Sequence, residues 1–209
     1  ECARLLGRRG HTVYLAEAGE ELGGRVTREA RLPGLAAWAR VRDYRLNQLN
    51  KMPNVETYRA SRVTAEQVLD FGATRIVLAT GATWRRDCGG RANTLPIRGF
   101  DRGANVLTPE NLMDGLRPQG PVIVFDDDHY YLGAILAEKL RADGLAVTLV
   151  TPADKVSAWT VNTLEQHTIQ KRLLDQGVEV VTNRNIIEFD GTRVVLQCTY
   201  TERQSVLPA

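Results

Sequence analysis

The chain has 209 residues, of which 43% are hydrophobic and 25% are charged, as in an ordinary globular protein. Its 27 Lys and Arg residues nearly balance 25 Asp and Glu residues, and the net charge of +2 excludes the basic footprint of a nucleic-acid-binding protein. Cys2, Cys88 and Cys198 lie too far apart for a paired metal spacing, and their odd number argues against a disulfide framework. Without a signal-peptide layout or a membrane-spanning apolar run, we expect a cytoplasmic protein with no membrane and no nucleic-acid partner.

The N-terminal residues predict the last turns of a helix followed by a buried strand. ECARLLGRRG (1–10) places two arginines before Gly10, a pattern typical of a helix C-terminus. HTVYLAEA (11–18) predicts a strand that ends on an acidic residue. Because no capping side chain precedes the helix, we expect the chain to enter in the middle of a βαβ unit.

The middle of the first half predicts one helical stretch and two more strands. An amphipathic pattern covers 35–50, and a strand is expected near 55–60. TRIVLATGA (74–82) predicts a second buried strand that ends at Gly81. Residues 84–105 are rich in Arg, Gly, Asn and Asp, which indicates a connecting segment.

The second half repeats the alternation of strand and helix. The expected strands are 121–125, 146–150 and 178–182, and the expected helices are 130–143 and 161–177. Short, wholly apolar strands that alternate with helices predict parallel sheets covered on both faces. We therefore expect an α/β fold of two Rossmann-like three-layer lobes, with a boundary near Gly120.

Three short motifs in the first half suggest a nucleotide site. Glu17 ends a predicted strand, where an acidic side chain accepts hydrogen bonds from an adenosine ribose. The matching G-x-G-x-x-G turn would lie about 20 residues earlier, before residue 1. Gly23-Gly24-Arg25 combines bare backbone with a phosphate-binding side chain, and Ala79-Thr80-Gly81 brings small residues to a strand's carboxyl end. Taken singly, Glu17 and the glycine pair are better explained as a solvated strand end and a plain turn, but the three motifs in this order favour a nucleotide site.

The acidic turn after the strand at 121–125 points the other way. Asp126 and Asp128 occupy the first two glycine places of a phosphate turn, and Tyr131 occupies the third. Carboxylates here would cap the following helix and repel a pyrophosphate. We therefore expect an incapacitated dinucleotide site, and the sequence offers no catalytic constellation and no metal site.

Five segments that cover nearly the whole chain carry a specific resemblance: ARLLGRRGHTVYLAEAGEELGGRV, LPGLAAWARVRDYR, VTAEQVLDFGATRIVLATGATWR, LTPENLMDG and GPVIVFDDDHYYLGAILAEKLRADGLAVTLVTP. Together they resemble the trimethylamine, dimethylamine and histamine dehydrogenase family. This family belongs to the iron–sulfur flavoproteins (the NADH:flavin oxidoreductase class) that also include 2,4-dienoyl-CoA reductase. The resemblance implies the nucleotide-binding domains of a larger enzyme, whose N-terminal TIM barrel carries FMN and a 4Fe-4S cluster and lies outside this chain.

The resemblance also implies a domain plan and a cofactor. Residues 1–119 resemble an ADP- or FAD-binding lobe, 120–184 a vestigial NAD(P)-binding lobe, and 185–209 a return toward the first lobe. ADP, or FAD, would occupy the first lobe, whereas NAD(P) is not expected in the second. The implied nucleotide-binding residues are Glu17, Gly23, Gly24, Arg25, Val63, Ala79, Thr80 and Gly81.

By the same resemblance, the parent would be a homodimeric amine dehydrogenase that passes electrons to an electron-transfer flavoprotein. Residues 38–44 match a region near the docking face for that acceptor. This chain alone is expected to be inactive. The alternatives are an FAD-containing NAD(P)H-dependent reductase module and a scaffold that binds no nucleotide.

Overall fold

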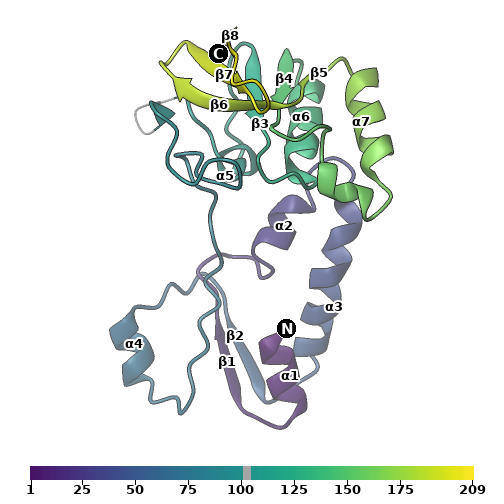
Figure 1. The fold of residues 1–209 in the computed structure, drawn as a ribbon. Coiled ribbons are helices and arrows are strands. Elements are labelled where there is room, and N and C mark those ends of the chain that lie inside the picture. The colour runs from purple at the N-terminus through teal and green to yellow at the C-terminus, as the bar shows by residue number, and fades with distance from the viewer. Residues whose placement is uncertain (101–104) are drawn as a thin grey trace. The chain divides into compact units, whose positions relative to one another are not determined.

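The computed structural model describes residues 1–100 and 105–209, and the chain divides into two compact units, Glu1–Ala82 and Thr83–Ala209 (Figure 1). Each unit contains helices and a parallel sheet. This confirms the predicted α/β class with parallel sheets. Among the described residues, no helix is both long enough and apolar enough to cross a membrane.

The first unit is built on two parallel strands, β1 (Val13–Ala16) and β2 (Val55–Tyr58). These strands confirm the predictions for 11–18 and near 55–60, and α3 confirms the helical stretch within 35–50. The helices of the unit are α1 (Cys2–Arg8), α2 (Arg25–Glu29), α3 (Ala39–Leu49) and α4 (Ala65–Asp70), with the 3-10 helix η1 (Ala36–Trp38) before α3.

Helix α1 packs closely against β2 because its contact point is a glycine. A Cβ at Gly7 would lie 2.5 Å from Cγ2 of Val55, so a larger residue could not occupy this position. The side-chain amide of Asn54 donates to the carbonyls of Gly7 (2.9 Å) and His11 (2.7 Å). Both contacts tie the end of α1 to the start of β2.

The strand expected over 74–82 is not formed, and that prediction is wrong. The segment has no regular structure, and Ile76, Val77 and Leu78 are 46%, 59% and 81% exposed. A strand requires a neighbouring backbone that completes its hydrogen bonds. In the described part of the first unit, β1 and β2 pair only with each other, so the apolar run 74–82 has no partner strand.

The second unit contains a parallel sheet in the order β3-β4-β5 and an antiparallel sheet in the order β6-β7-β8. Its parallel strands confirm the strands predicted at 121–125, 146–150 and 178–182, and α6 confirms the helix predicted over 130–143. The bounds are α5 (Pro109–Met113), β3 (Val122–Phe125), α6 (Leu132–Ala142), β4 (Val147–Val150), η3 (Ala158–Val161), α7 (Gln166–Asp175), β5 (Glu179–Val181), β6 (Arg184–Phe189), β7 (Arg193–Cys198) and β8 (Gln204–Pro208).

Helix α7 begins later than the predicted span 161–177. Leu164 has a φ of 62° and the 3-10 helix η3 precedes it, so the regular helix begins only at Gln166. The antiparallel sheet over 184–208 was not predicted from the sequence.

The connecting segment before β3 packs into the second unit. Ile97, Phe100 and Val106 form a buried cluster with residues of both sheets, among them Ile186 and Phe189. The rings of Phe100 and Phe189 lie 5.4 Å apart. Contacts within this chain therefore group 83–119 with the second unit. The division into lobes at 1–119, 120–184 and 185–209 stays a prediction.

Candidate functional site

Glu17 lies directly after the carboxyl end of β1 and is held there by backbone bonds to β2 and the segment after it. Its N–H donates to the carbonyl of Tyr58 (2.8 Å), and its carbonyl accepts from the N–H of Ser61 (2.8 Å). The amide of Gly19 donates to Oε1 of Glu17 at 2.8 Å, which orients the half-buried carboxylate. A carboxylate fixed beside the ends of two parallel strands is suited to accept hydrogen bonds from the hydroxyl groups of a sugar.

Val63 lies on the segment that follows β2, and the start of this segment runs beside Glu17. The N–H of Ala60 donates to the carbonyl of Gly19 (2.8 Å), so residues 60–61 run alongside 17–19. Val63 is 48% exposed and precedes Thr64, whose side chain forms a capping box with Gln67 at the start of α4. The structure thus brings the segment that carries Val63 to the same strand ends as Glu17.

Gly23 and Gly24 form the turn that leads into α2. Their φ angles are 114° and 53°, in the region that glycine adopts readily and other residues rarely do. A Cβ at Gly24 would meet no atom within 4 Å, so this backbone is open to a ligand. The next side chain is not free: Nε of Arg25 lies 3.3 Å from Oε1 of the buried Glu29.

The remaining predicted motif does not join these residues. Ala79, Thr80 and Gly81 lie in the irregular, exposed segment after α4. Within the described residues, no hydrogen bond or ion pair connects them to Glu17 or to the Gly23–Gly24 turn. Their predicted role at the edge of a sheet is therefore not realised in the sheet of this unit.

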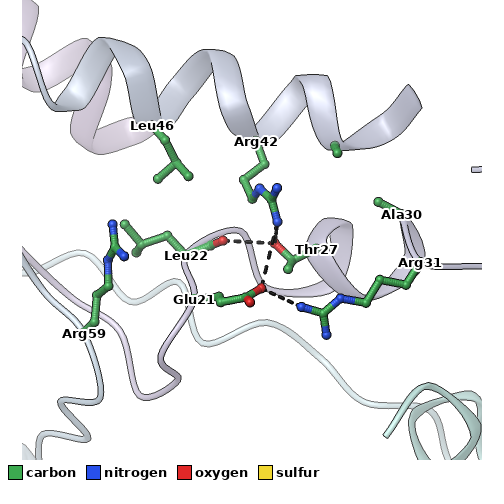
Figure 2. A pocket seen from close by; sticks show the side chains of 9 residues that line it. Glu21, Leu22, Thr27, Ala30, Arg31, Arg42, Leu46 and Arg59 are labelled. Atoms are coloured by element: carbon green, nitrogen blue, oxygen red, sulfur yellow. Dashed lines mark hydrogen bonds and ion pairs between the residues drawn. The ribbon is translucent and has the colours of Figure 1, made fainter. Parts of the chain in front are cut away.

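A pocket of about 420 Å³ lies beside the glycine turn (Figure 2). Thr27 and Arg42 meet in it, and Arg42 comes from the middle of α3. Neither residue was identified from the sequence, because they are 15 positions apart and no motif links them. The lining residues are Glu21, Leu22, Thr27, Ala30, Arg31, Ala39, Arg42, Leu46 and Arg59.

The acidic turn of the second unit fills its own anion position. Oδ1 of Asp126 accepts from the amides of Asp128 (3.2 Å) and His129 (3.0 Å) just before α6. Asp126 is 3% exposed, and this burial raises the pKa of its carboxyl to about 6. The N–H groups that a phosphate would need are thus bonded to a side chain.

A second carboxylate of the turn binds the chain's own loop. Both carboxylate oxygens of Asp127 accept a hydrogen bond from the backbone amide of Ala92, each at 2.9 Å. On the same loop, the guanidinium of Arg91 lies 4.5 Å from the ring centroid of Trp159. The loop is therefore bonded to the turn through Asp127. Within residues 1–100 and 105–209, no group of three or more His, Cys, Asp or Glu side chains could hold a metal ion.

Comparisons with known proteins agree with this architecture. Residues 107–206 match the family model of the OYE-like second alpha/beta domain. The chain is 37% identical to dimethylamine dehydrogenase of Hyphomicrobium sp. (strain x) over 203 residues, covering 94% of this chain and 27% of that protein.

Two solved structures are similar to nearly the entire chain. Histamine dehydrogenase from Rhizobium sp. 4-9 is 43% identical with a TM-score of 0.93, covering 99% of this chain and 32% of that one. The 6-hydroxypseudooxynicotine amine oxidase of Pseudomonas geniculata N1 is 42% identical with a TM-score of 0.95, covering 99% of this chain and 31% of that one. The chain thus spans about a third or less of these relatives, and it belongs to the trimethylamine, dimethylamine and histamine dehydrogenase family that its sequence motifs resemble.

Proposed function

We propose that this chain is the adenine-nucleotide-holding part of a flavin- and iron–sulfur-dependent amine dehydrogenase. In this proposal the first unit holds ADP as a static ligand, and the second unit is a vestigial dinucleotide domain that contributes to assembly. The chain by itself carries no amine-oxidising activity.

The observation that carries the proposal is the placement of Glu17. Its backbone is tied to β2 through Tyr58 and Ser61, and its carboxylate is aimed by the Gly19 amide. Within the part of the chain that the structure describes, Oε2 of Glu17 makes no hydrogen bond, so it is available to the ribose hydroxyls of an adenosine. The open backbone at Gly24 supports a ligand on the same unit.

The other nucleotide contacts are part of the proposal. Val63 would line the adenine nucleotide, and Arg25 would reach a phosphate only by leaving its ion pair with Glu29. Ala79, Thr80 and Gly81 are also proposed to contact the nucleotide, from the irregular segment in which they lie. Each of these roles follows from the family resemblance.

The second unit does not fit NAD(P). A dinucleotide phosphate would have to displace Asp126 from the amides of Asp128 and His129, and it would meet the Asp127 carboxylate beside them. This chemistry favours the amine dehydrogenase proposal over an NAD(P)H-dependent reductase, which needs an open phosphate turn.

The activity of the whole protein is proposed from its relatives. FMN in a TIM barrel outside this chain would accept electrons from an amine, and a 4Fe-4S cluster would pass them to an electron-transfer flavoprotein. The exposed side chains of Val41 and Tyr44 on α3 lie in the stretch 38–44 proposed to border that acceptor's docking face. We further propose that the parent is a homodimer and is cytoplasmic.

Analysis of the bound small molecules tests this proposal. The protein is expressed from its complete coding sequence, purified, and denatured, and the released compounds are identified by mass spectrometry. We expect ADP without FAD, near one molecule per polypeptide. Release of FAD would support the reductase instead, and release of no adenylate would support a scaffold that binds no nucleotide.

A further inference from the structure

The Gly23–Gly24 turn has one closed side and one open side. A Cβ at Gly23 would lie 2.8 Å from Cδ of Arg42 and even closer to Oγ1 of Thr27, so both side chains press against this residue. A Cβ at Gly24 would instead meet open space. The turn is therefore shaped by its own protein on one side and left accessible on the other.

The hydroxyl of Thr27 links the turn to α3. It donates to the carbonyl of Leu22 (3.0 Å), the residue just before the glycines. It also accepts a hydrogen bond from Nη1 of Arg42 (3.3 Å). Thr27 is 5% exposed, so this hydroxyl has little competition from water, and its two bonds join the turn, the first residues of α2 and the middle of α3.

Arg42 is held in turn by carboxylates on both sides of its guanidinium. Nε and Nη2 each lie 2.8 Å from Oδ1 of Asp43, and Nη1 lies 4.0 Å from Oε2 of Glu21. That same Glu21 oxygen accepts from Nη2 of Arg31 at 2.7 Å (Figure 2). Because a guanidinium presents its donors in a fixed fork, these partners fix the direction in which Nη1 points.

We infer that Thr27 and Arg42 are positioning residues that hold the Gly23–Gly24 turn in its nucleotide-binding shape before the ligand arrives. This inference rests on the proposed function for the identity of the ligand, an adenine nucleotide, but its structural part is independent of it. Preforming the turn lowers the conformational cost of binding, because two glycines would otherwise lose much backbone freedom when the ligand binds.

Two substitutions of Thr27 and one matched control test the inference in the protein expressed from its complete coding sequence. Thr27→Val keeps the side-chain shape and removes the hydroxyl, whereas Thr27→Ser keeps the hydroxyl. The control is Thr160→Val in the second unit, where an equally buried threonine hydroxyl donates to the carbonyl of Ser157 at 2.7 Å. The measurements are ADP affinity of nucleotide-stripped protein, amide hydrogen exchange of a peptide covering 21–27 without ADP, and thermal stability.

We expect Thr27→Val to speed exchange over 21–27 and to weaken ADP binding by about three- to tenfold, the worth of one net hydrogen bond. Thr27→Ser should restore both properties, and Thr160→Val should lose similar stability while binding ADP normally. Unchanged exchange over 21–27 in Thr27→Val would overturn the inference, as would equal weakening of ADP binding by the Thr160 control. If the unmodified protein binds no adenylate, the proposed function fails, and the exchange data still decide whether Thr27 holds the turn.

Discussion

Gly133 and Asp126 are in such close contact that the glycine has no room for a side chain. A Cβ at Gly133 would lie 2.8 Å from Cγ and 2.9 Å from Cβ of Asp126. Gly133 is in the first turn of α6, and the carboxylate of Asp126 caps the amides just before that helix. The absence of a side chain at Gly133 is therefore what allows a carboxylate to fill the anion position of this turn.

We predict that Gly133→Ala lowers the free energy of unfolding by about 1–3 kcal/mol, the usual cost of overpacking a buried contact. Denaturant unfolding of the full chain measures it. The double variant Asp126→Gly/Gly133→Ala removes the side chain that would clash with the new Cβ, so its loss should be smaller than the sum of the single losses. Strict additivity would contradict the contact.

The Asp126 carboxyl should make stability depend on pH between about 4 and 6. Burial raises its pKa from 3.8 to about 6, so the folded state favours the protonated form. The protonated Asp126 carboxyl contributes fully to the free energy of unfolding below its pKa in the unfolded chain. This contribution is lost as the pH rises through its pKa in the folded chain, and the loss is about 3 kcal/mol at most. Asp126→Asn cannot ionise, so the difference in unfolding free energy between wild type and this variant should shrink or reverse from pH 4 to pH 7. A pH-independent difference would refute the prediction.

The loop at 89–93 should depend on one carboxylate of the acidic turn and not on its neighbour. Both oxygens of Asp127 accept a hydrogen bond from the Ala92 amide. Among the residues that the structure describes, the Asp128 side chain forms no hydrogen bond or ion pair. We predict faster amide exchange over 89–93 in Asp127→Ala, with a stability loss of roughly 1 kcal/mol. Asp128→Ala serves as the matched control and should leave exchange of the loop unchanged. Equal exchange in the two variants would show that Asp127 does not hold the loop.

Much of this fold follows from local sequence pattern, and the exceptions have physical causes. The apolar run 74–82 has the composition of a strand, but composition cannot supply the neighbouring backbone that a strand requires. The antiparallel sheet over 184–208 leaves only a weak local signal: a turn at Asp190-Gly191 precedes Arg193–Cys198, where the buried Val194 and Leu196 alternate with less buried residues. That alternation is the period of a strand with one buried face.

Some residues of the candidate site can likewise be predicted from local sequence pattern, and others cannot. Glu17 and the glycine turn are recognisable because strand ends and glycine pairs leave local signals in the sequence. Thr27 and Arg42 are ordinary residues whose importance arises only from where α3 packs. The sequence alone shows the charge of the acidic turn. The hydrogen bond between Asp127 and Ala92 joins positions 35 apart, and no sequence pattern predicts it.

Two cysteines should differ strongly in their reactivity toward an alkylating reagent. Hydrogen bonds from the Thr201 side chain and from the amides of Thr201 and Tyr200 lower the pKa of the Cys198 thiol to about 7. Burial, with the carboxylates of Asp87 and Asp127 nearby, raises the pKa of Cys88 to about 12. Because the thiolate is the nucleophile, iodoacetamide should label Cys198 at neutral pH with a rate that rises most steeply near pH 7. Peptide mapping should find Cys88 unlabelled until the protein is denatured, and early labelling of Cys88 would contradict this.

Glu17→Gln should reduce the ADP content of the protein made from the complete coding sequence. The substitution keeps Oε1 as an acceptor for the Gly19 amide, so the local turn is preserved while the charge is lost. Hydrogen bonds to a charged acceptor are worth roughly 1–1.5 kcal/mol more than bonds to a neutral one, which corresponds to about tenfold in affinity. Glu20→Gln, at an exposed glutamate three positions along, removes the same charge and should leave ADP content unchanged. If Glu17→Gln retains ADP as tightly as the control does, the ribose contact assigned to Glu17 is wrong, whatever nucleotide the protein holds.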